Sequence, residues 1–375
     1  MRSFAPMTRS KSGSPRPARL PSLDGLRAFS AAMVVFCHAG KVLKVGRRVP
    51  FGMGVLDDWG PVGVTVFFVI SGFLITNLLL DERRETSAIN LRAFYFRRTF
   101  RILPAYWTYL AVVAVLASAG FVNADTNGFA HAVSFTTDYF NPSSWALNHS
   151  WSLSVEEQFY LLWPLAVVVL GAMKARRTAL VLLCAAPVAR VLTYYFAPQL
   201  RPAITSMLHL RVDALMIGCW AALEREARPS SRILELLARP VSGLLGAAYC
   251  VVIASVVRHA GGPVVTAALG YSLEALGACA VVLWALKHPA SRAGRILNAA
   301  PVARVGVLSY SLYLWQQLWL THETPTPLWA IPLLVAGAVL SAEASYRFVE
   351  APMLRLRSRL QSALTRQPAH SPGVQ

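Results

Sequence analysis

Charged residues are scarce in this chain, and acidic ones are scarcer than basic ones. Charged residues make up 14% of its 375 residues, whereas hydrophobic residues make up 55%. A soluble globular domain carries about 25% charged residues, so this composition excludes that class. The 36 Lys and Arg exceed the 18 Asp and Glu, which gives a net charge of +18. These basic residues lie in short stretches between apolar runs, so they do not indicate nucleic-acid binding.

Cysteine pairs and metal-ligand spacings are also missing. The five cysteines all lie in apolar runs, with no CxxC or Cys/His spacing, so we expect small core residues and neither disulfides nor a metal site. They are Cys37, Cys184, Cys219, Cys250 and Cys279. The basic first 25 residues could pass for the start of a signal peptide. The apolar run that follows lacks a small-x-small cleavage pattern, so it is expected to be a retained helix.

Ten apolar segments are long enough, or nearly so, to span a membrane. They predict an all-α polytopic bundle of about ten transmembrane helices, with no internal repeat. The segments begin near Leu26, Pro61, Leu103, Val155, Thr178, Leu208, Val241, Val264, Val305 and Leu328. Most Lys and Arg fall in the two tails and in every second loop, which predicts that both termini of a multi-pass inner-membrane protein are cytoplasmic. The predicted cytoplasmic segments are 1–25, 81–102, 173–177, 224–240, 287–304 and the tail after Glu350.

These boundaries divide the chain into three parts. We expect a basic cytoplasmic tail over 1–22, a transmembrane domain over 23–352, and a basic, partly disordered cytoplasmic tail over 353–375. The longest outer segment, 123–150, contains no Lys or Arg and is rich in Asn, Ser, Thr and aromatic residues. It suits a loop that folds over a polar acceptor.

Two polar side chains stand out in the first apolar segment. Arg27 and His38 are eleven residues apart, which places them on one helix face about 16 Å from each other. Such groups in the apolar layer are costly and usually face a bundle interior or a wet cavity. Two interpretations stay open: a snorkelling Arg with a His bonded to a neighbouring helix, or a functional pair. His38 can exchange a proton near neutral pH and is the best candidate for a base.

The segment "AFYFRRTFRILPAYW" gathers three arginines among aromatic residues. Arg97, Arg98 and Arg101 occupy about one helical turn. Positive-inside anchoring explains them without a ligand. Guanidinium groups also bind phosphates bidentately, and aromatic rings stack on bases, so a nucleotide phosphate site is an equal alternative.

The stretch "NHSWSLSVEEQFYLLWP" carries two adjacent carboxylates. Ser154 and Glu157 fit a capping box, which predicts a helix start at Ser154. Glu156 instead shares a face with aromatic residues and needs a partner on another helix, for which a cation or imidazole is the natural candidate. His149, expected at the outer surface, is either a solvated loop histidine or a site residue.

Further polar residues interrupt later apolar runs. Arg211 and Asp213 are about 200° apart around a helix, so each is expected to find a partner on another helix. Ser71, beside Gly72, favours close helix packing. Tyr310 shares a face with Tyr313, and both could be interfacial aromatics.

Together these motifs resemble the acyltransferase-3 family of membrane-bound O-acyltransferases, which acylate sugars of bacterial surface polysaccharides and some macrolides. The likeness covers 23–352 and rests on "LDGLRAFSAAMVVFCHAG", "FFVISGFLIT", "FYFRRTFRILPAYW", "HSWSLSVEEQFYLLWP", "RVDALMIG", "SYSLYLW" and "YRFVEAPM". It implies a cytoplasmic acyl-CoA donor, commonly acetyl-CoA, and a membrane lipid setting. The implied acceptor is a hydroxyl of a lipid-linked or exported glycan, with a macrolide or other small-molecule hydroxyl as the alternative.

The resemblance also suggests roles for residues. It implies His38 and Glu156 as catalytic, and it implies four arginines as acyl-CoA ligands, namely Arg27, Arg97, Arg98 and Arg101. Substrate-binding or orienting roles are expected for Ser71, His149, Arg211, Asp213 and Tyr310. The chain departs from the family at Gln316, where members usually have His, and at Ala351, which separates Glu350 from Pro352. We expect a standalone form without the extracytoplasmic esterase-like domain of some relatives.

The resulting hypothesis places the CoA phosphates at the arginine cluster and runs pantetheine up the bundle towards His38. Direct transfer and an acyl-histidine intermediate both fit. The rival hypothesis is an ion-coupled transporter or flippase, because intramembrane charges also serve transport. No inverted repeat supports that rival. The sequence does not indicate an oligomeric state.

Overall fold

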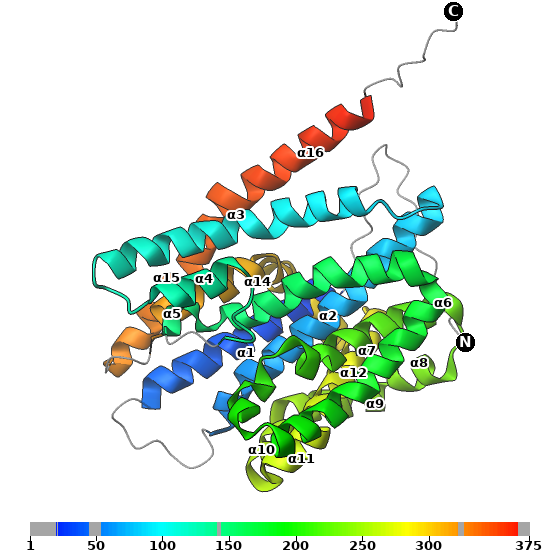
Figure 1. Cartoon of the computed structure of the whole chain (residues 1–375), viewed down its shortest axis with the longest axis horizontal. Coiled ribbons are helices and arrows are strands. Elements are labelled where there is room, and N and C mark those ends of the chain that lie inside the picture. The colour runs from blue at the N-terminus through cyan, green and yellow to red at the C-terminus, as the bar shows by residue number, and fades with distance from the viewer. Residues whose placement is uncertain (1–19, 21, 45–53, 141–143, 322–325, 367–375) are drawn as a thin grey trace, which may run out of the picture.

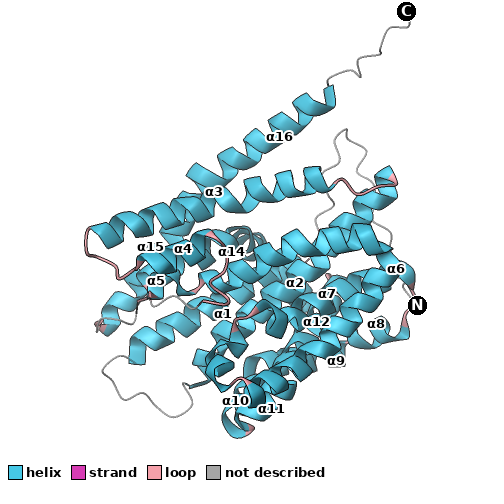
Figure 2. Ribbon diagram, in the orientation of Figure 1, coloured by secondary structure: helices cyan, strands magenta, loops and turns pink. Residues whose placement is uncertain are grey.

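The computed structural model describes residues 20, 22–44, 54–140, 144–321 and 326–366. Within these ranges the chain consists of helices joined by turns and loops, with no strand (Figure 2), so the predicted all-α class is confirmed. Eight helical stretches of this described part are long and apolar enough to cross a membrane. One of them, 145–196, contains two of the predicted segments, because Gly171 interrupts the helix with φ +70° and ψ 164°.

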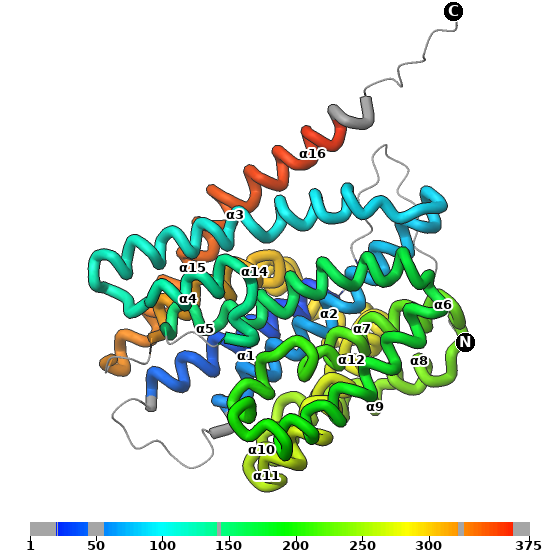
Figure 3. The backbone as a smooth tube through the Cα atoms, in the orientation of Figure 1, coloured from blue at the N-terminus to red at the C-terminus, as the bar shows by residue number. Residues whose placement is uncertain are grey.

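All ten predicted segments are therefore helical, the remaining one being α14. The number of crossings and the side of the termini stay predictions. The five long helices of the first part are α1 (Leu23–Lys44), α2 (Gly54–Thr86), α3 (Leu91–Ser118), α6 (Ser150–Phe196) and α7 (Leu208–Ala227). Figures 1 and 3 show α2 running through the bundle, where it packs on α1, α6 and α7.

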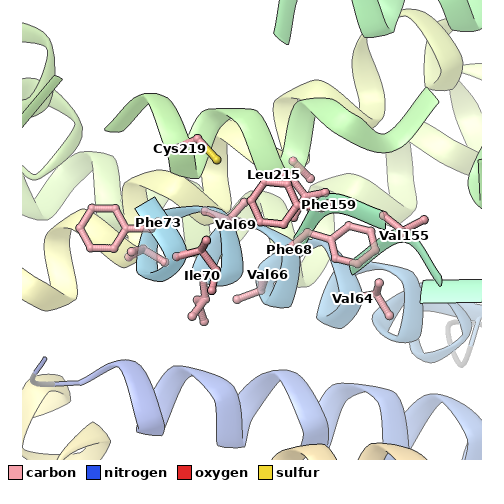
Figure 4. Close-up of a cluster of buried hydrophobic side chains, with 14 of the residues drawn as sticks. Val64, Val66, Phe68, Val69, Ile70, Phe73, Val155, Phe159, Leu215 and Cys219 are labelled. Atoms are coloured by element: carbon pink, nitrogen blue, oxygen red, sulfur yellow. The ribbon is translucent and has the colours of Figure 1, made fainter. Parts of the chain in front are cut away.

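Apolar side chains of α2 fill the centre of the bundle. Figure 4 shows Phe68, Val69 and Phe73 of α2 near Leu215 of α7 and Phe159 of α6. All five are buried. This packing positions α6, and α2 also packs on α1; these two helices, α1 and α6, carry part of the candidate site.

The outer segment 123–150 folds into short helices, as far as it is described. They are α4 (Thr126–Val133) and α5 (Trp145–Asn148), and η1 (Pro198–Thr205) lies between α6 and α7. Asp138, which lies between α4 and α5 in the sequence, is buried. Its carboxylate accepts hydrogen bonds from Gln158 Nε2 of α6 (2.8 Å) and from the Leu208 amide at the start of α7 (3.3 Å). The segment is thus fixed to the bundle.

The second part of the chain contains shorter elements. They are α8 (Arg232–Leu237), α9 (Pro240–Ala248), the π-helical turn η2 (Tyr249–Ile253), α10 (Ala254–Ala260), α11 (Gly262–Val265), the π-helical turn η3 (Thr266–Gly270), α12 (Tyr271–Lys287) and α13 (Arg292–Leu297). α12 packs on α9, α2 and α7.

The last helices return to α1 and α3. They are α14 (Ala300–Trp319), η4 (Leu328–Ala330), α15 (Ile331–Ser345), the π-helical turn η5 (Tyr346–Glu350) and α16 (Ala351–Arg366). α14 packs against both α1 and α15, and α16 extends beyond the bundle after contacting α3 (Figure 1). The tail predicted over 353–375 thus begins as helix. Residues 367–375, where disorder is predicted, and most of 1–22 lie outside the described residues.

Two local predictions are wrong. The predicted capping box does not form, because the short helix α5 leads directly into α6 and the new helix begins at Ser150. Ser154 is therefore interior to α6, and its hydroxyl donates to the Ser150 carbonyl (3.0 Å). Cys184 is exposed, unlike the other four cysteines, because its part of α6 lies at the outside of the bundle.

Glycine permits backbone contact between α2 and α7, as the small pair Ser71–Gly72 predicts. A Cβ added at Gly72 would lie 2.1 Å from the Leu215 carbonyl oxygen, and one at Gly218 would lie 2.2 Å from that of Val69. No side chain fits there unless the helices separate.

We predict that Gly72→Ala lowers the free energy of unfolding by about 1–3 kcal/mol, because the methyl group overpacks this contact. Gly40→Ala is the matched control, since a Cβ there would make ordinary contact with Leu56 at 3.6 Å. In α1 that change should stabilise by about 0.5–1 kcal/mol through helix propensity. Melting of the detergent-solubilised variants measures both. Equal melting temperatures for the two variants would contradict the close approach.

Candidate active site

His38 of α1 makes a hydrogen bond to α14. Its Nδ1 lies 2.6 Å from Oε1 of Gln316, which is fully buried. The Trp145 ring packs edge-on against the imidazole, with ring centroids 5.0 Å apart. His38 is therefore bonded to a neighbouring helix, and whether it also acts in function depends on what surrounds it.

A second histidine lies in the same region of the bundle. His149, at the start of α6, is 4% exposed and within electrostatic range of His38. Neither of its ring nitrogens has a hydrogen-bond partner among the described residues. Its ring meets those of Tyr109 and Tyr313, at centroid distances of 5.2 and 5.5 Å. The interpretation as a solvated loop histidine is wrong, because α5 and the start of α6 fold into the bundle.

Glu156 is bonded to α2 instead of to a cation. Ser71 Oγ donates to its Oε1 (2.6 Å), and the Tyr160 hydroxyl donates to Ser71 Oγ (3.3 Å). Arg27 and Arg98 lie within electrostatic range of this carboxylate. The predicted need for a partner on another helix is confirmed, and two predicted site residues, Ser71 and Glu156, come together.

The three arginines of α3 have different surroundings. Arg98 lies over the Tyr160 ring, 4.7 Å from its centroid. Arg101 is 3.7 Å from Glu350, a carboxylate that also accepts a hydrogen bond from Ser311. Arg97 instead pairs with Glu82 at 2.8 Å, near the surface.

Arg27 joins Arg98 and Arg101 at this end of the bundle. The guanidinium groups of Arg98 and Arg101 are each within electrostatic range of Arg27. The Nε of Arg27 is buried and has no hydrogen-bond partner in the described part of the chain. Cations held close together in this way favour a bound anion.

One face of α14 connects the arginines with the histidines. The Tyr310 hydroxyl donates to the Ile102 carbonyl of α3 (2.9 Å), so this tyrosine points towards a neighbouring helix. The Tyr313 hydroxyl lies 2.5 Å from that of Ser152 and donates to the His149 carbonyl (3.2 Å). Tyr310 is also within electrostatic range of Glu156 and Glu157.

These residues form a continuous set that we call the polar column. It consists of Arg27, Arg98, Arg101, Glu156, Glu157, Tyr310, Tyr313, His149, His38 and Gln316, from α1, α3, α6 and α14. Buried polar atoms without a partner recur along it, at Arg27, Glu157 and His149. Each such atom costs about 1–3 kcal/mol, so proteins rarely keep them without a reason. A polar ligand along the column would satisfy them.

Arg211 and Asp213 lie elsewhere. Arg211 donates to Thr65 Oγ1 (2.6 Å), and Asp213 pairs with Arg190 (2.9 Å). Three arginines, Arg190, Arg211 and Arg258, lie over the ring of Tyr271. We call these residues, with Asp213, the Tyr271 cluster. The predicted pairing with other helices is confirmed. The structure does not bring Asp213 to His38, because its partners belong to the second half of α6 and to α12.

Sequence reasoning missed three residues near the column. Gln316 was noted only as a departure from the family pattern. The spacing of Tyr310, Tyr313 and Gln316 places all three on one helix face, and this signal could have identified it. Glu157 was assigned to a helix cap. Arg357 of α16 lies seven residues after Glu350, hence on the same face, and is within electrostatic range of Arg97 and Arg101.

Comparison with known proteins identifies the family. A family model described as an acyltransferase domain, Acyl_transf_3, matches residues 20–344. Peptidoglycan O-acetyltransferase OatA of Listeria monocytogenes is 28% identical over 372 residues, which cover 89% of this chain and 56% of that protein. The putative peptidoglycan O-acetyltransferase YrhL of Bacillus subtilis is 29% identical over 375 residues, covering 89% of this chain and 55% of the relative.

O-acetyltransferase OatA of Staphylococcus aureus is 28% identical over 366 residues, covering 90% of this chain and 57% of the relative. The chain thus spans about half the length of the curated relatives it matches. No solved structure matches it. The family match extends from α1 into α15 and includes every residue of the polar column, so the chain belongs to the acyltransferase-3 family.

Proposed function

We propose that this chain is an integral membrane O-acyltransferase that moves an acyl group, commonly acetyl, from acyl-CoA to a hydroxyl of a lipid-linked or exported glycan. Family membership and the names of the relatives support the reaction class. The observation that carries the proposal is the polar column, in which unpartnered buried groups extend from Arg27 to His149 beside His38. Peptidoglycan is the first acceptor to test, since two relatives bear that name. A macrolide or other small-molecule hydroxyl is the alternative.

The donor would enter at the arginine end, on the cytoplasmic side in the topology proposed here. Arg98 and Arg101, with Arg27 behind them, would hold the CoA phosphates through charge-assisted hydrogen bonds. Arg97 would remain at the rim, where Glu82 holds it. Pantetheine carries amide N–H groups, for which the unpartnered Oε1 of Glu157 is an acceptor.

The reaction itself would take place at His38. A sugar hydroxyl is a poor nucleophile, so Nε2 of His38 would take its proton as the oxygen attacks the thioester carbonyl. The carbon–sulfur bond then breaks, and the proton passes from the imidazole to the departing thiolate, which leaves as CoA. A neutral His149 could donate an N–H to the carbonyl oxygen while charge develops there. An acyl-histidine route uses the same atoms.

Glu156 takes a different part in this scheme. It is bonded to Ser71 and lies near Arg27 and Arg98, at the donor end. We therefore propose that it orients the arginines and balances their charge, and that it moves no proton. The transporter hypothesis also uses intramembrane charges, but family membership favours acyl transfer over it.

His38→Ala should lower kcat by about 10²- to 10⁴-fold, because the hydroxyl loses its base. The measurement is acetyl transfer from labelled acetyl-CoA to muropeptides by purified protein in detergent. His288→Ala is the control, since His288 stacks on Trp284 at the end of α12, away from the polar column. Turnover retained in His38→Ala would remove this residue from catalysis.

Arg98→Gln should raise KM for acetyl-CoA by about ten- to a hundredfold, with a smaller effect on kcat, because a charge-assisted phosphate contact is lost. Arg177→Gln is the control for a general effect of removing a basic residue from the predicted cytoplasmic side, since Arg177 is exposed in α6, six residues after Gly171. If both variants keep the wild-type KM, the arginines of α3 serve anchoring alone.

A further inference from the structure

The hydrogen bonds of Gln316 favour one orientation of its amide. Its Nε2 donates to the Tyr313 carbonyl one turn earlier in α14 (3.4 Å), and its Oε1 lies 2.6 Å from Nδ1 of His38. Rotating the amide by 180° would lose this hydrogen bond and would turn two oxygens towards each other at the Tyr313 carbonyl. The favoured orientation therefore directs the oxygen of Gln316 at the imidazole.

This orientation determines which imidazole nitrogen carries the proton. A carboxamide oxygen accepts hydrogen bonds and cannot donate one, so Nδ1 of His38 must be the protonated nitrogen. In a neutral imidazole the other nitrogen, Nε2, then holds the basic lone pair. An unheld imidazole would exchange between its two tautomers and present the lone pair only part of the time.

The helices that carry these two side chains pack on each other. Their main chains come close at Gly306 of α14, ten residues before Gln316, where an added Cβ would lie 1.9 Å from the Asp24 carbonyl oxygen of α1. Trp145, which packs on the His38 ring, donates its indole N–H to the Gln317 carbonyl (2.9 Å). The amide and the imidazole are thus fixed by helix packing and by a shared neighbour.

We propose that Gln316 is a positioning residue, whose amide oxygen keeps the His38 proton on Nδ1 and so makes Nε2 the nitrogen that takes the acceptor proton. This inference rests on the proposed role of His38 as base. Because the amide is neutral, it orients the ring without adding a charge to the apolar layer. It also stabilises the imidazolium less than a carboxylate at the same place would.

Other titratable groups near this imidazole bear on any pH measurement. His149 lies at the start of α6, Tyr313 is on α14, and Lys41 lies on α1 over the Trp145 ring (5.4 Å). On α2, the backbone carbonyl of Asp57 accepts from the thiol of Cys37, the residue next to His38. A comparison among Gln316 variants leaves all of these groups in place.

The test compares Gln316→Leu with Gln316→Glu, and Gln317→Leu is the matched control from the same helix. Gln316→Leu should lower kcat about 10- to 100-fold with KM for acetyl-CoA unchanged, as expected when the partner that orients an imidazole is lost. Gln316→Glu restores an acceptor for Nδ1 and should recover most of kcat. Its carboxylate stabilises the imidazolium, so the acid limb of the kcat/KM profile should move up by about one to three pH units. Gln317→Leu should resemble wild type.

The tautomer of His38 can be measured by NMR, without an activity assay. In protein labelled with ¹⁵N-histidine, the His38 signal, assigned by its loss in His38→Ala, should show a protonated Nδ1 and an unprotonated Nε2, and Gln316→Leu should change that pattern. An unchanged pattern, or a Gln316→Glu pH profile identical to wild type at equal melting temperature, would overturn the positioning role. If the tautomer result holds and His38→Ala keeps its turnover, His38 is not the base, while the contact between Gln316 and His38 stands. If the wild-type protein transfers no acetyl group although the tautomer result holds, the proposed function fails and the contact again stands.

Discussion

A polar group in the apolar layer must find its partner on another helix, and this constraint organises the bundle. His38 of α1 bonds to Gln316 of α14, and Glu156 of α6 bonds to Ser71 of α2. Each bond joins helices that are distant in sequence and already touch through small residues or apolar side chains. Burying these polar side chains costs free energy unless their partners lie on the neighbouring helix, so the bonds favour these helix pairs over others. The same contacts place α1, α6 and α14 around one polar interior.

The two polar regions of the bundle both contain buried charged groups, and they differ in which chemical groups they bring together. In the Tyr271 cluster, Arg190 is fully buried and donates to two backbone carbonyls, to Asp213 and to Ser272, so it needs no further partner. Along the polar column, His149 is buried with both ring nitrogens unpartnered by the described residues. Unpartnered buried atoms occur in both regions, since Nε of Arg211 in the Tyr271 cluster also lacks a partner among the described residues. The column is distinguished by its two imidazoles, His38 and His149, which can exchange a proton near neutral pH, and this is why the proposed reaction is placed there.

The sequence predicted the parts of this arrangement that depend on local pattern. Apolar length located the ten helical segments, and helical periodicity placed Arg27 and His38 on one face of α1. What it missed depends on tertiary packing. The burial of His149 follows from α5 folding into the bundle, which no periodicity signals. The partner of His38 is 278 residues away on α14, and Gln316 in an apolar helix gives no sign of its bond.

The central claim is that the donor extends along the polar column from the arginines to His38. The most direct test treats the His38→Cys variant with the pyridyl disulfide of CoA, which reacts with a nearby thiol by disulfide exchange. Mass spectrometry of the peptides then identifies which cysteine carries CoA. The account predicts a mixed disulfide between CoA and the new cysteine, suppressed by excess CoA and weakened by Arg98→Gln. No adduct at residue 38 when the reagent saturates donor binding, measured by competition with labelled acetyl-CoA, would contradict it.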